Sequence, residues 1–148
     1  MRYRTFLLAV ASIILSTTRL LHAESPTVTS IPQGWNPNLD AAVEWMRIEL
    51  DDATGQMQVN SISRAIADMK DVELFVIYFR LSEHLTTKQR KSLGEAQAQW
   101  LKERAKYVES AIDSRGGSLA AYEASQAEIK FTEARIKELR EKLSLYED

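Results

Sequence analysis

A stripe of side chains spaced alternately by three and four residues runs through the last part of the chain, and it constrains the fold more than any other feature. Its members are Tyr122, Ser125, Ile129, Thr132, Ile136, Leu139, Leu143 and Tyr146. Successive residues of an α-helix are rotated by about 100°, so this spacing places them all on one face of a helix. A lone helix cannot bury such a face, and we therefore expect other helices to pack against it.

The positions of the prolines divide the chain. All three lie between residues 26 and 37, in "SPTVTSIPQGWNPN", and none follows. Because proline interrupts helices, we expect residues 24–37 to form a leader and residues 38–148 to form a helical domain. Hydrophobic residues make up 45% of the chain and charged residues 27%, which is typical of a globular protein.

The first two predicted helices are separated by "DDATG". The first covers residues 39–50, with Asn38 or Asp40 as its N-cap. Its apolar residues are Ala42, Val43, Trp45, Met46 and Leu50. The second helix covers residues 56–84, and its middle, "ELFVIYF", is apolar nearly all round. Helical spacing continues through this run, so we expect a helix there, with a strand as the alternative.

The third predicted helix starts with a capping box between Thr86 and Gln89, and it ends near Ser114, before a pair of glycines. We expect Ser118 to cap the fourth helix, which continues to about residue 146. The predicted fold class is therefore all-α. It is a compact four-helix bundle-like domain with three long helices and one short one.

The first 23 residues have the layout of a secretory signal peptide. Arg2 and Arg4 form a basic start, and the ten-residue apolar run "FLLAVASIIL" precedes a polar stretch that ends at "LHA". We expect cleavage between Ala23 and Glu24, which would make the protein periplasmic or secreted through a bacterial Sec-type route. The alternative is an uncleaved membrane anchor, which would normally need roughly 20 apolar residues.

Charge and cysteine content restrict the partners of the mature chain. Removing residues 1–23 takes away three of the 19 basic residues and none of the 21 acidic ones, so the formal net charge changes from −2 to −5. This charge argues against binding to nucleic acid or to an anionic membrane, and it permits a basic protein partner. The absence of cysteine excludes both disulfide bonds and a lipid-anchored export signal.

Several polar side chains fall on helical faces that should be buried. In "AQAQWLKERAKY", Gln97 and Arg104 share a face with Trp100. The whole inward polar set is Asp71, Gln97, Arg104, Thr132 and Arg135. Buried charges must be paired and hydrogen-bonded, so one interpretation is a structural network that fixes the register of the helices. The other is a site for a ligand or partner.

The sequence predicts no catalytic site, cofactor or metal. The mature chain has one histidine, His84, and no cysteine, so neither an HExxH motif nor a zinc-binding pattern of cysteines and histidines is present. Acidic residues 49, 51 and 52 lack the ligand spacing of a calcium loop. Ser118 does not lie in a nucleophile-elbow sequence. We therefore expect a protein that is not an enzyme.

Three residues are candidates for contact with a partner. Trp35 lies in the leader, where it can either cover an edge of the bundle or act as an exposed anchor, since tryptophan is frequent among interface hot spots. Arg115 and Ser118 lie in the turn between the third and fourth helices. Side chains of such a turn can reach into the cleft of another protein.

Several short motifs, taken in order, resemble one family. "L-x(3)-Q-x(2)-WL-x(2)-R" starts at Leu93, "GGS" occupies residues 116–118, and "T-x(2)-R-x(3)-L" starts at Thr132. Upstream, "T-x(5)-N" starts at Thr54 and "D-x(2)-L-x(3)-Y-x(2)-L" starts at Asp71. Together they resemble the LprI-like lysozyme inhibitor family. These motifs include the whole predicted polar network and the tryptophan that shares its face: Asp71, Gln97, Trp100, Arg104, Thr132 and Arg135.

The resemblance implies an exported, non-catalytic helical protein whose partner is a lysozyme or another basic envelope protein. The alternative is a periplasmic interaction or envelope-maintenance module with a different partner. The family commonly carries four cysteines that form disulfides. The matching positions here are Leu50, Ile62, Val108 and Ala127, all apolar. We expect Ile62 and Val108 to be buried in compensation, and the other two to lie beside apolar neighbours.

Overall fold

The computed structural model describes residues 37–147. The expected signal peptide, nearly all of the leader and Trp35 lie outside the described residues. The elements are α1 (Leu39–Asp51), α2 (Gln56–His84), α3 (Thr87–Ser110), α4 (Ala120–Leu143) and the short 3-10 helix η1 (Ser144–Tyr146). Residues 37–147 contain no strand, and the apolar run at 73–79 is helical. The predicted all-α fold class is confirmed.

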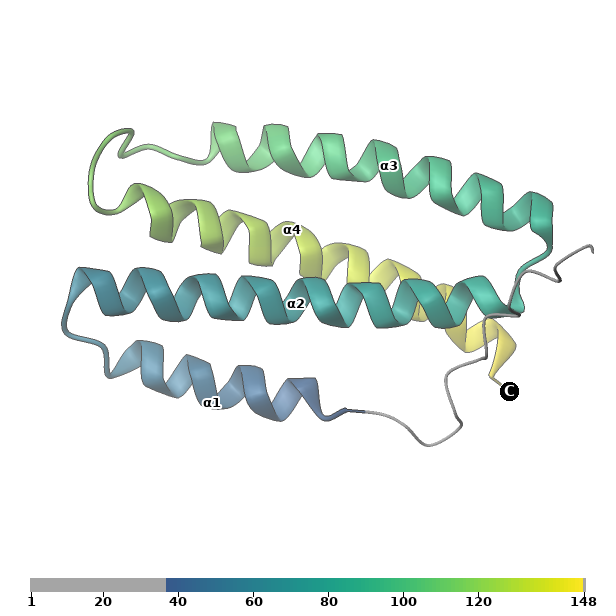
Figure 1. Cartoon of the computed structure of the whole chain (residues 1–148), viewed down its shortest axis with the longest axis horizontal. Coiled ribbons are helices and arrows are strands. Elements are labelled where there is room, and N and C mark those ends of the chain that lie inside the picture. The colour runs from purple at the N-terminus through teal and green to yellow at the C-terminus, as the bar shows by residue number, and fades with distance from the viewer. Residues whose placement is uncertain (1–36, 148) are drawn as a thin grey trace, which may run out of the picture.

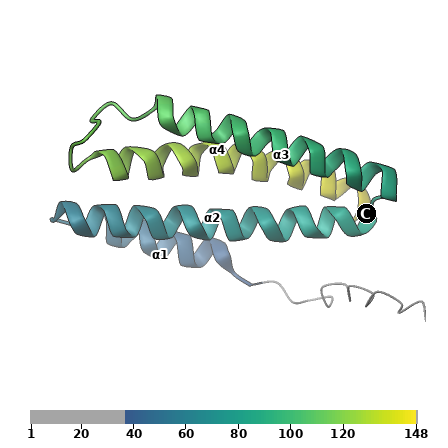
Figure 2. The ribbon, with the colours of Figure 1, turned by 45° about the horizontal axis from the view of Figure 1, so that its top comes forward.

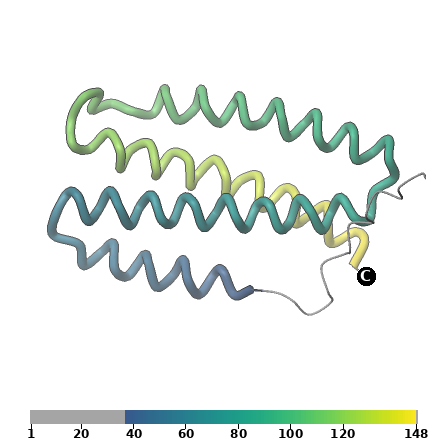
Figure 3. Tube along the Cα trace, viewed as in Figure 1, coloured from purple at the N-terminus to yellow at the C-terminus, as the bar shows by residue number. Residues whose placement is uncertain are grey.

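The long helices α2 and α4 pack along each other, while α3 flanks α4 and α1 flanks α2 (Figures 1 and 2). Consequently α1 and α3 lie on opposite sides of the α2–α4 pair. The tube in Figure 3 shows the α1–α2 and α3–α4 connections at one end of the bundle, whereas the α2–α3 connection lies at the other end.

Two hydrophobic clusters hold these helices together. The larger one joins α2, α3 and α4, and it consists of Leu74, Ile77, Leu81, Leu93, Trp100, Ile136, Leu139 and Leu143. The smaller one joins α1, α2 and α4 through Val43, Ile66, Ala67 and Ile129. The stripe of α4 therefore lies at the centre of the domain, and Leu139 is fully buried. Burial of these side chains is the main stabilising contribution in a chain without disulfide bonds.

Two of the predicted helix caps are present. The Asn38 side chain accepts a hydrogen bond from the Ala41 amide at 3.0 Å, which selects Asn38 over Asp40 as the cap of α1. Thr86 and Gln89 form the reciprocal capping box of α3. Each cap satisfies amide groups that the first helical turn leaves without partners.

The predicted end of α3 and the predicted N-cap of α4 are wrong. Helix α3 ends at Ser110, and the glycine pair lies in the following loop, where Gly116 has a φ of +79°. Ser118 does not cap α4: Leu119 occupies the N-cap position and no side chain caps that helix. The reason is a competing set of hydrogen bonds, described below, in which Glu123 organises the loop.

The predicted apolar surface of α1 is only partly buried. Val43 is 3% exposed, but Trp45 is 63% exposed because α1 lies at the edge of the bundle and contacts it along a single face. The prediction that Ile62 and Val108 are buried is also wrong, since both are half-buried. Ile62 nevertheless packs, together with Leu50, against the smaller hydrophobic cluster.

Candidate functional site

Arg104 links the three long helices. From α3, its guanidinium donates hydrogen bonds to the Asp71 carboxylate of α2 and, at 3.2 Å, to the Thr132 hydroxyl of α4. The Glu128 carboxylate of α4 lies 3.6 Å away, and the guanidinium lies 4.9 Å from the centre of the Trp100 ring. The Arg104 side chain is only 15% exposed. These contacts make Arg104 an interhelical tie, because they connect α3 to both α2 and α4.

Arg135 and Gln97 form a second tie, between α4 and α3. The Arg135 Nε group donates to the Gln97 side-chain oxygen at 3.2 Å, and its Nη1 group donates to Glu138 at 2.6 Å. Glu138 also accepts from Lys142 at 2.6 Å. These hydrogen bonds, that from Lys142 first, hold the pKa of Glu138 below its ordinary value. Within residues 37–147, no hydrogen bond connects this set to Arg104, so the inward polar residues form two ties instead of one network.

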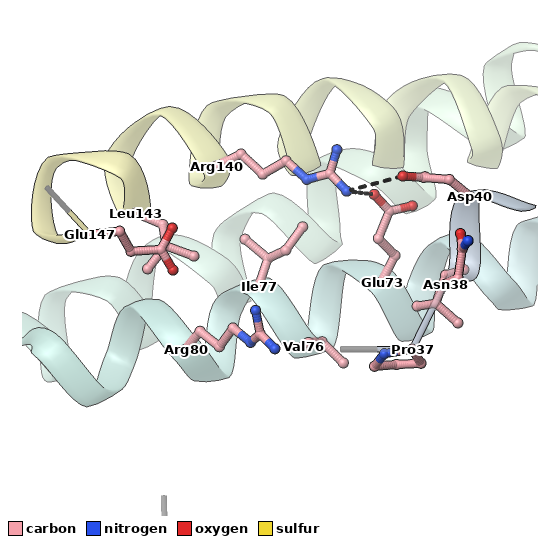
Figure 4. Close-up of a pocket in the computed structure, with 11 residues that line it drawn as sticks. Pro37, Asn38, Asp40, Glu73, Val76, Ile77, Arg80, Arg140, Leu143 and Glu147 are labelled. Carbon is pink, nitrogen blue, oxygen red and sulfur yellow. Dashed lines mark hydrogen bonds and ion pairs between the residues drawn. The ribbon is translucent and has the colours of Figure 1, made fainter. Parts of the chain in front are cut away.

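A third charged cluster fastens α1 to α2 and α4. Lys70 donates to Glu73 at 2.9 Å, and Arg140 donates to the other oxygen of Glu73 at 2.7 Å. The side chains of Lys70 and Glu73 are 10% and 5% exposed. The Asp40 carboxylate of α1 lies 3.9 Å from the Lys70 ammonium nitrogen and 3.9 Å from a guanidinium nitrogen of Arg140. Figure 4 shows Arg140 reaching from α4 towards Glu73 and Asp40.

This cluster was not predicted from the sequence, although the sequence contains a signal for it. Lys70 and Glu73 lie on the inward face of α2, beside apolar residues at helical spacing, in the same way as Asp71. Three members of the cluster, Asp40, Glu73 and Arg140, form one wall of a cavity of about 530 Å³ whose other walls include Val76, Ile77 and Leu143 (Figure 4). Glu73 and Arg140 are paired with each other, and their ion pair connects α2 to α4. The cluster therefore holds these helices together.

The loop between α3 and α4, residues 111–119, is held in a defined conformation by Glu123. This carboxylate accepts hydrogen bonds from the amides of Asp113 and Ser114, both at 3.0 Å, and from the Ser114 hydroxyl at 2.9 Å. The Ser114 bonds are the main cause of a lowered pKa for Glu123. The loop is therefore fixed to the first turns of α4 without a capping side chain.

The two partner-contact candidates in this loop, Arg115 and Ser118, are both exposed. Arg115 donates one hydrogen bond, at 3.1 Å, to the Glu109 main-chain oxygen at the end of α3. The main-chain oxygen of Ser118 accepts from the Asn60 side chain of α2 at 3.0 Å. The loop is thus braced from two helices, while the side chains of Arg115 and Ser118 remain at the surface. We call residues 111–119 the braced loop.

The described residues contain neither a candidate metal site nor a candidate membrane-spanning helix. Among residues 37–147, no group of three histidine, aspartate or glutamate side chains is arranged to hold a metal ion. In the same part of the chain, no helix combines the length and the apolar character needed to cross a membrane.

These features define a small helical scaffold, tied internally by ion pairs, that presents one braced loop at the end of the bundle. A family model described as lysozyme inhibitor LprI matches residues 50–139, which is more than half of the chain. The protein therefore belongs to the LprI family, as a member without cysteine. The comparisons with curated proteins and with solved structures each found no match. The matched residues contain the whole inward polar set and the braced loop, whereas nearly all of α1 precedes them.

Proposed function

We propose that the mature protein is an exported, non-catalytic inhibitor that binds a lysozyme-type muramidase and blocks its cleft. The family match over residues 50–139 is the observation that carries this proposal. In this proposal residues 1–23 are a signal peptide removed on export, residues 24–37 are a leader, and residues 38–148 are the inhibitory domain. The bound state needs no cofactor and no membrane.

The braced loop is suited to entering a cleft. Its conformation is fixed by Glu123 and Asn60 before any partner binds, so little conformational entropy remains to be lost on association. Arg115 uses one of its five N–H donors on Glu109, and the others are available to a partner. Glycoside hydrolases such as lysozyme use a pair of carboxyl groups at the scissile bond. A guanidinium makes short, charge-assisted hydrogen bonds to such groups.

Net charge supports the same partner. The mature chain carries −5, and a basic lysozyme would be attracted to it over a Debye length of about 8 Å at physiological ionic strength. Long-range attraction of this kind mainly raises the association rate, whereas the affinity depends on the residues that become desolvated at the interface.

The test is a titration of muramidase activity on cell walls with the mature protein, residues 24–148, at several salt concentrations. We expect a vertebrate-type lysozyme or a bacterial muramidase to be titrated to near zero activity, with slower association at high salt. Arg115→Ala should weaken inhibition at least about tenfold, as expected for a hot-spot residue. Arg90→Ala, which removes an exposed arginine from the first turn of α3, should leave inhibition unchanged.

Two results would contradict the proposal in different ways. An absence of inhibition at tens of micromolar, against both kinds of enzyme, would reject the inhibitor and favour an envelope interaction module with another partner. Equal inhibition by the Arg115→Ala and Arg90→Ala proteins would keep the inhibitor and reject the braced loop as the part that enters the cleft.

A further inference from the structure

The outer face of α1 exposes large apolar side chains. Trp45 and Ile48 are 63% and 52% exposed, and they lie three residues apart, on the same side of the helix. Met57, at the start of α2, is 84% exposed, and it lines a shallow depression together with Glu49 and Asp52. We call Trp45, Ile48, Glu49, Asp52 and Met57 the α1 face.

The α1 face has an acidic border. Glu44, Glu49, Asp51 and Asp52 are all exposed, and in the described part of the chain none of them forms an ion pair. The only basic residue of α1, Arg47, donates instead to Glu133 of α4 at 2.9 Å. The face therefore presents carboxylates around an aromatic side chain, with no cation of its own helix among them.

The opposite side of α1 is fixed to the domain, so the α1 face has a defined geometry. Val43 is buried in the smaller hydrophobic cluster, with Met46 and Leu50 packed against it. The Arg47–Glu133 ion pair and the approach of Asp40 to Lys70 add polar contacts on that side. A partner of the α1 face would meet a rigid helix, which keeps the entropic cost of binding low.

We propose that the α1 face is a docking surface for a basic protein, and that Trp45 is its anchor. The inference rests on the proposed function in one respect, namely that the basic protein is the inhibited muramidase. Charge complementarity selects this occupant. An anionic membrane would be repelled by the four carboxylates, and a second copy of the same face would bring like charges together. Trp45 supplies the large desolvated contact that interface hot spots require.

The α1 face and the braced loop are two different surfaces. The family match begins at residue 50, so Trp45 and Ile48 lie outside it. The C-terminal end of α1 and the braced loop lie at the same end of the bundle (Figure 1). A single basic partner could therefore contact the loop with its cleft and the α1 face with an adjoining surface.

The experiment measures binding of the mature protein, residues 24–148, to a vertebrate-type lysozyme by surface plasmon resonance. We expect Trp45→Ser to raise the Kd at least about tenfold. Phe75→Ser is the matched control, since Phe75 is a 66% exposed aromatic on α2, and it should change the Kd less than twofold. Both variants remove an exposed side chain, and their unfolding midpoints should stay close to that of the wild type.

A second pair of variants tests the acidic border. Glu49→Gln combined with Asp52→Asn should slow association severalfold at low salt, and the difference should vanish at high salt, where the charges are screened. Glu83→Gln, which removes an exposed carboxylate near the end of α2, should leave the rate close to that of the wild type.

The outcomes separate this inference from the proposed function. If the wild type inhibits and Trp45→Ser inhibits equally well, the α1 face is rejected and the inhibitor stands. If the wild type binds lysozyme through Trp45 without inhibiting it, the docking surface stands and the inhibitor is rejected. If the wild type neither binds nor inhibits, both are rejected. A dimer of the wild type that Trp45→Ser abolishes would overturn the assignment to a basic partner.

Discussion

The guanidinium of Arg104 on α3 donates a hydrogen bond to the carboxylate of Asp71 on α2, so two helices that both pack on α4 are also tied to each other. The tie also includes Thr132 at the centre of α4, and Thr132 is fully buried. Asp71 is 39% exposed, and water therefore screens part of the attraction between the two charges. The tie contributes to stability, but by less than a fully buried ion pair does.

Arg104→Ala should lower the free energy of unfolding by about 2 kcal/mol. This is below the roughly 3–5 kcal/mol expected when both charges of a pair are fully buried, because Asp71 retains contact with water. The loss includes the hydrogen bond to Thr132 and the contact with the Trp100 ring. Chemical denaturation followed by circular dichroism measures the change.

The control for this prediction is Lys102→Ala. Lys102 lies on the exposed side of α3, and its removal should change stability by no more than about 0.5 kcal/mol. If both variants lost the same small amount, the interhelical tie would contribute nothing measurable to stability.

Glu73→Ala should be among the more destabilising single changes in the domain, by about 3 kcal/mol. Among residues 37–147, it leaves the buried Lys70 ammonium with carboxylates of Asp40 and Glu133 at 3.9 and 3.8 Å, in place of a partner at 2.9 Å. Replacing both buried charges, as Lys70→Met with Glu73→Leu, should recover much of the loss, since apolar side chains need no partners. A double variant as unstable as Glu73→Ala would show that the damage comes from packing.

The braced loop should loosen in acid because of Glu123. The pKa of this carboxyl is lowered in the folded protein by hydrogen bonds from Ser114. Its contribution to loop stability is thus fully present above the unfolded pKa, roughly 4.3, and is lost as the pH falls through the lower folded value. Protection factors for exchange of the Asp113 and Ser114 amides should fall over that range.

Glu123→Ala should produce the same loss of protection at neutral pH, without changing the protection of amides in the middle of α2. The contrast matters because it distinguishes local opening of the loop from global unfolding. Unchanged protection of the Asp113 and Ser114 amides in this variant would mean that Glu123 does not hold the loop.

Local sequence patterns predicted most of the architecture. The capping box at Thr86 depends only on residues three positions apart, and the stripe of α4 depends only on helical periodicity. The same periodicity predicted that Asp71 and Arg104 face neighbouring helices, although Asp71 remains 39% exposed. Such patterns identify the face of a helix that turns inward, and that was enough to place the two residues in the same part of the bundle.

Features that depend on contacts between distant segments were not predictable in this way. Trp45 has the spacing of a buried residue, but its exposure is set by the position of α1 at the edge of the bundle. The end of α3 at Ser110 depends on Glu123, thirteen residues further along, which binds the loop amides. Periodicity within one helix contains no information about either contact.

Export should remove the first 23 residues. If residues 1–23 are a signal peptide, the intact mass of protein from the periplasm or the medium should correspond to a chain that starts at Glu24. Replacing Ala23 with a large residue, as in Ala23→Leu, should slow or shift the cleavage, because the processing site requires small side chains. Recovery of the full-length wild-type chain from the inner membrane would instead indicate an uncleaved anchor.

The resemblance to the cysteine-containing members of the family predicts that Val108 and Ala127 lie close enough for a crosslink. Val108 is half-buried near the end of α3 and Ala127 is 7% exposed on α4, and these two helices pack against each other. A disulfide requires Cα atoms within about 7 Å and compatible Cβ directions. Val108→Cys combined with Ala127→Cys should then oxidise in the periplasm and raise the unfolding midpoint. The crosslink closes a loop of about 20 residues in the unfolded chain, which should stabilise the folded protein by roughly 3 kcal/mol.

The matched control is Val108→Cys with Ala134→Cys, which places the second cysteine on the exposed side of α4 and should remain reduced. A folded Val108→Cys, Ala127→Cys protein that stays reduced would show that these two positions do not correspond to a disulfide of the family.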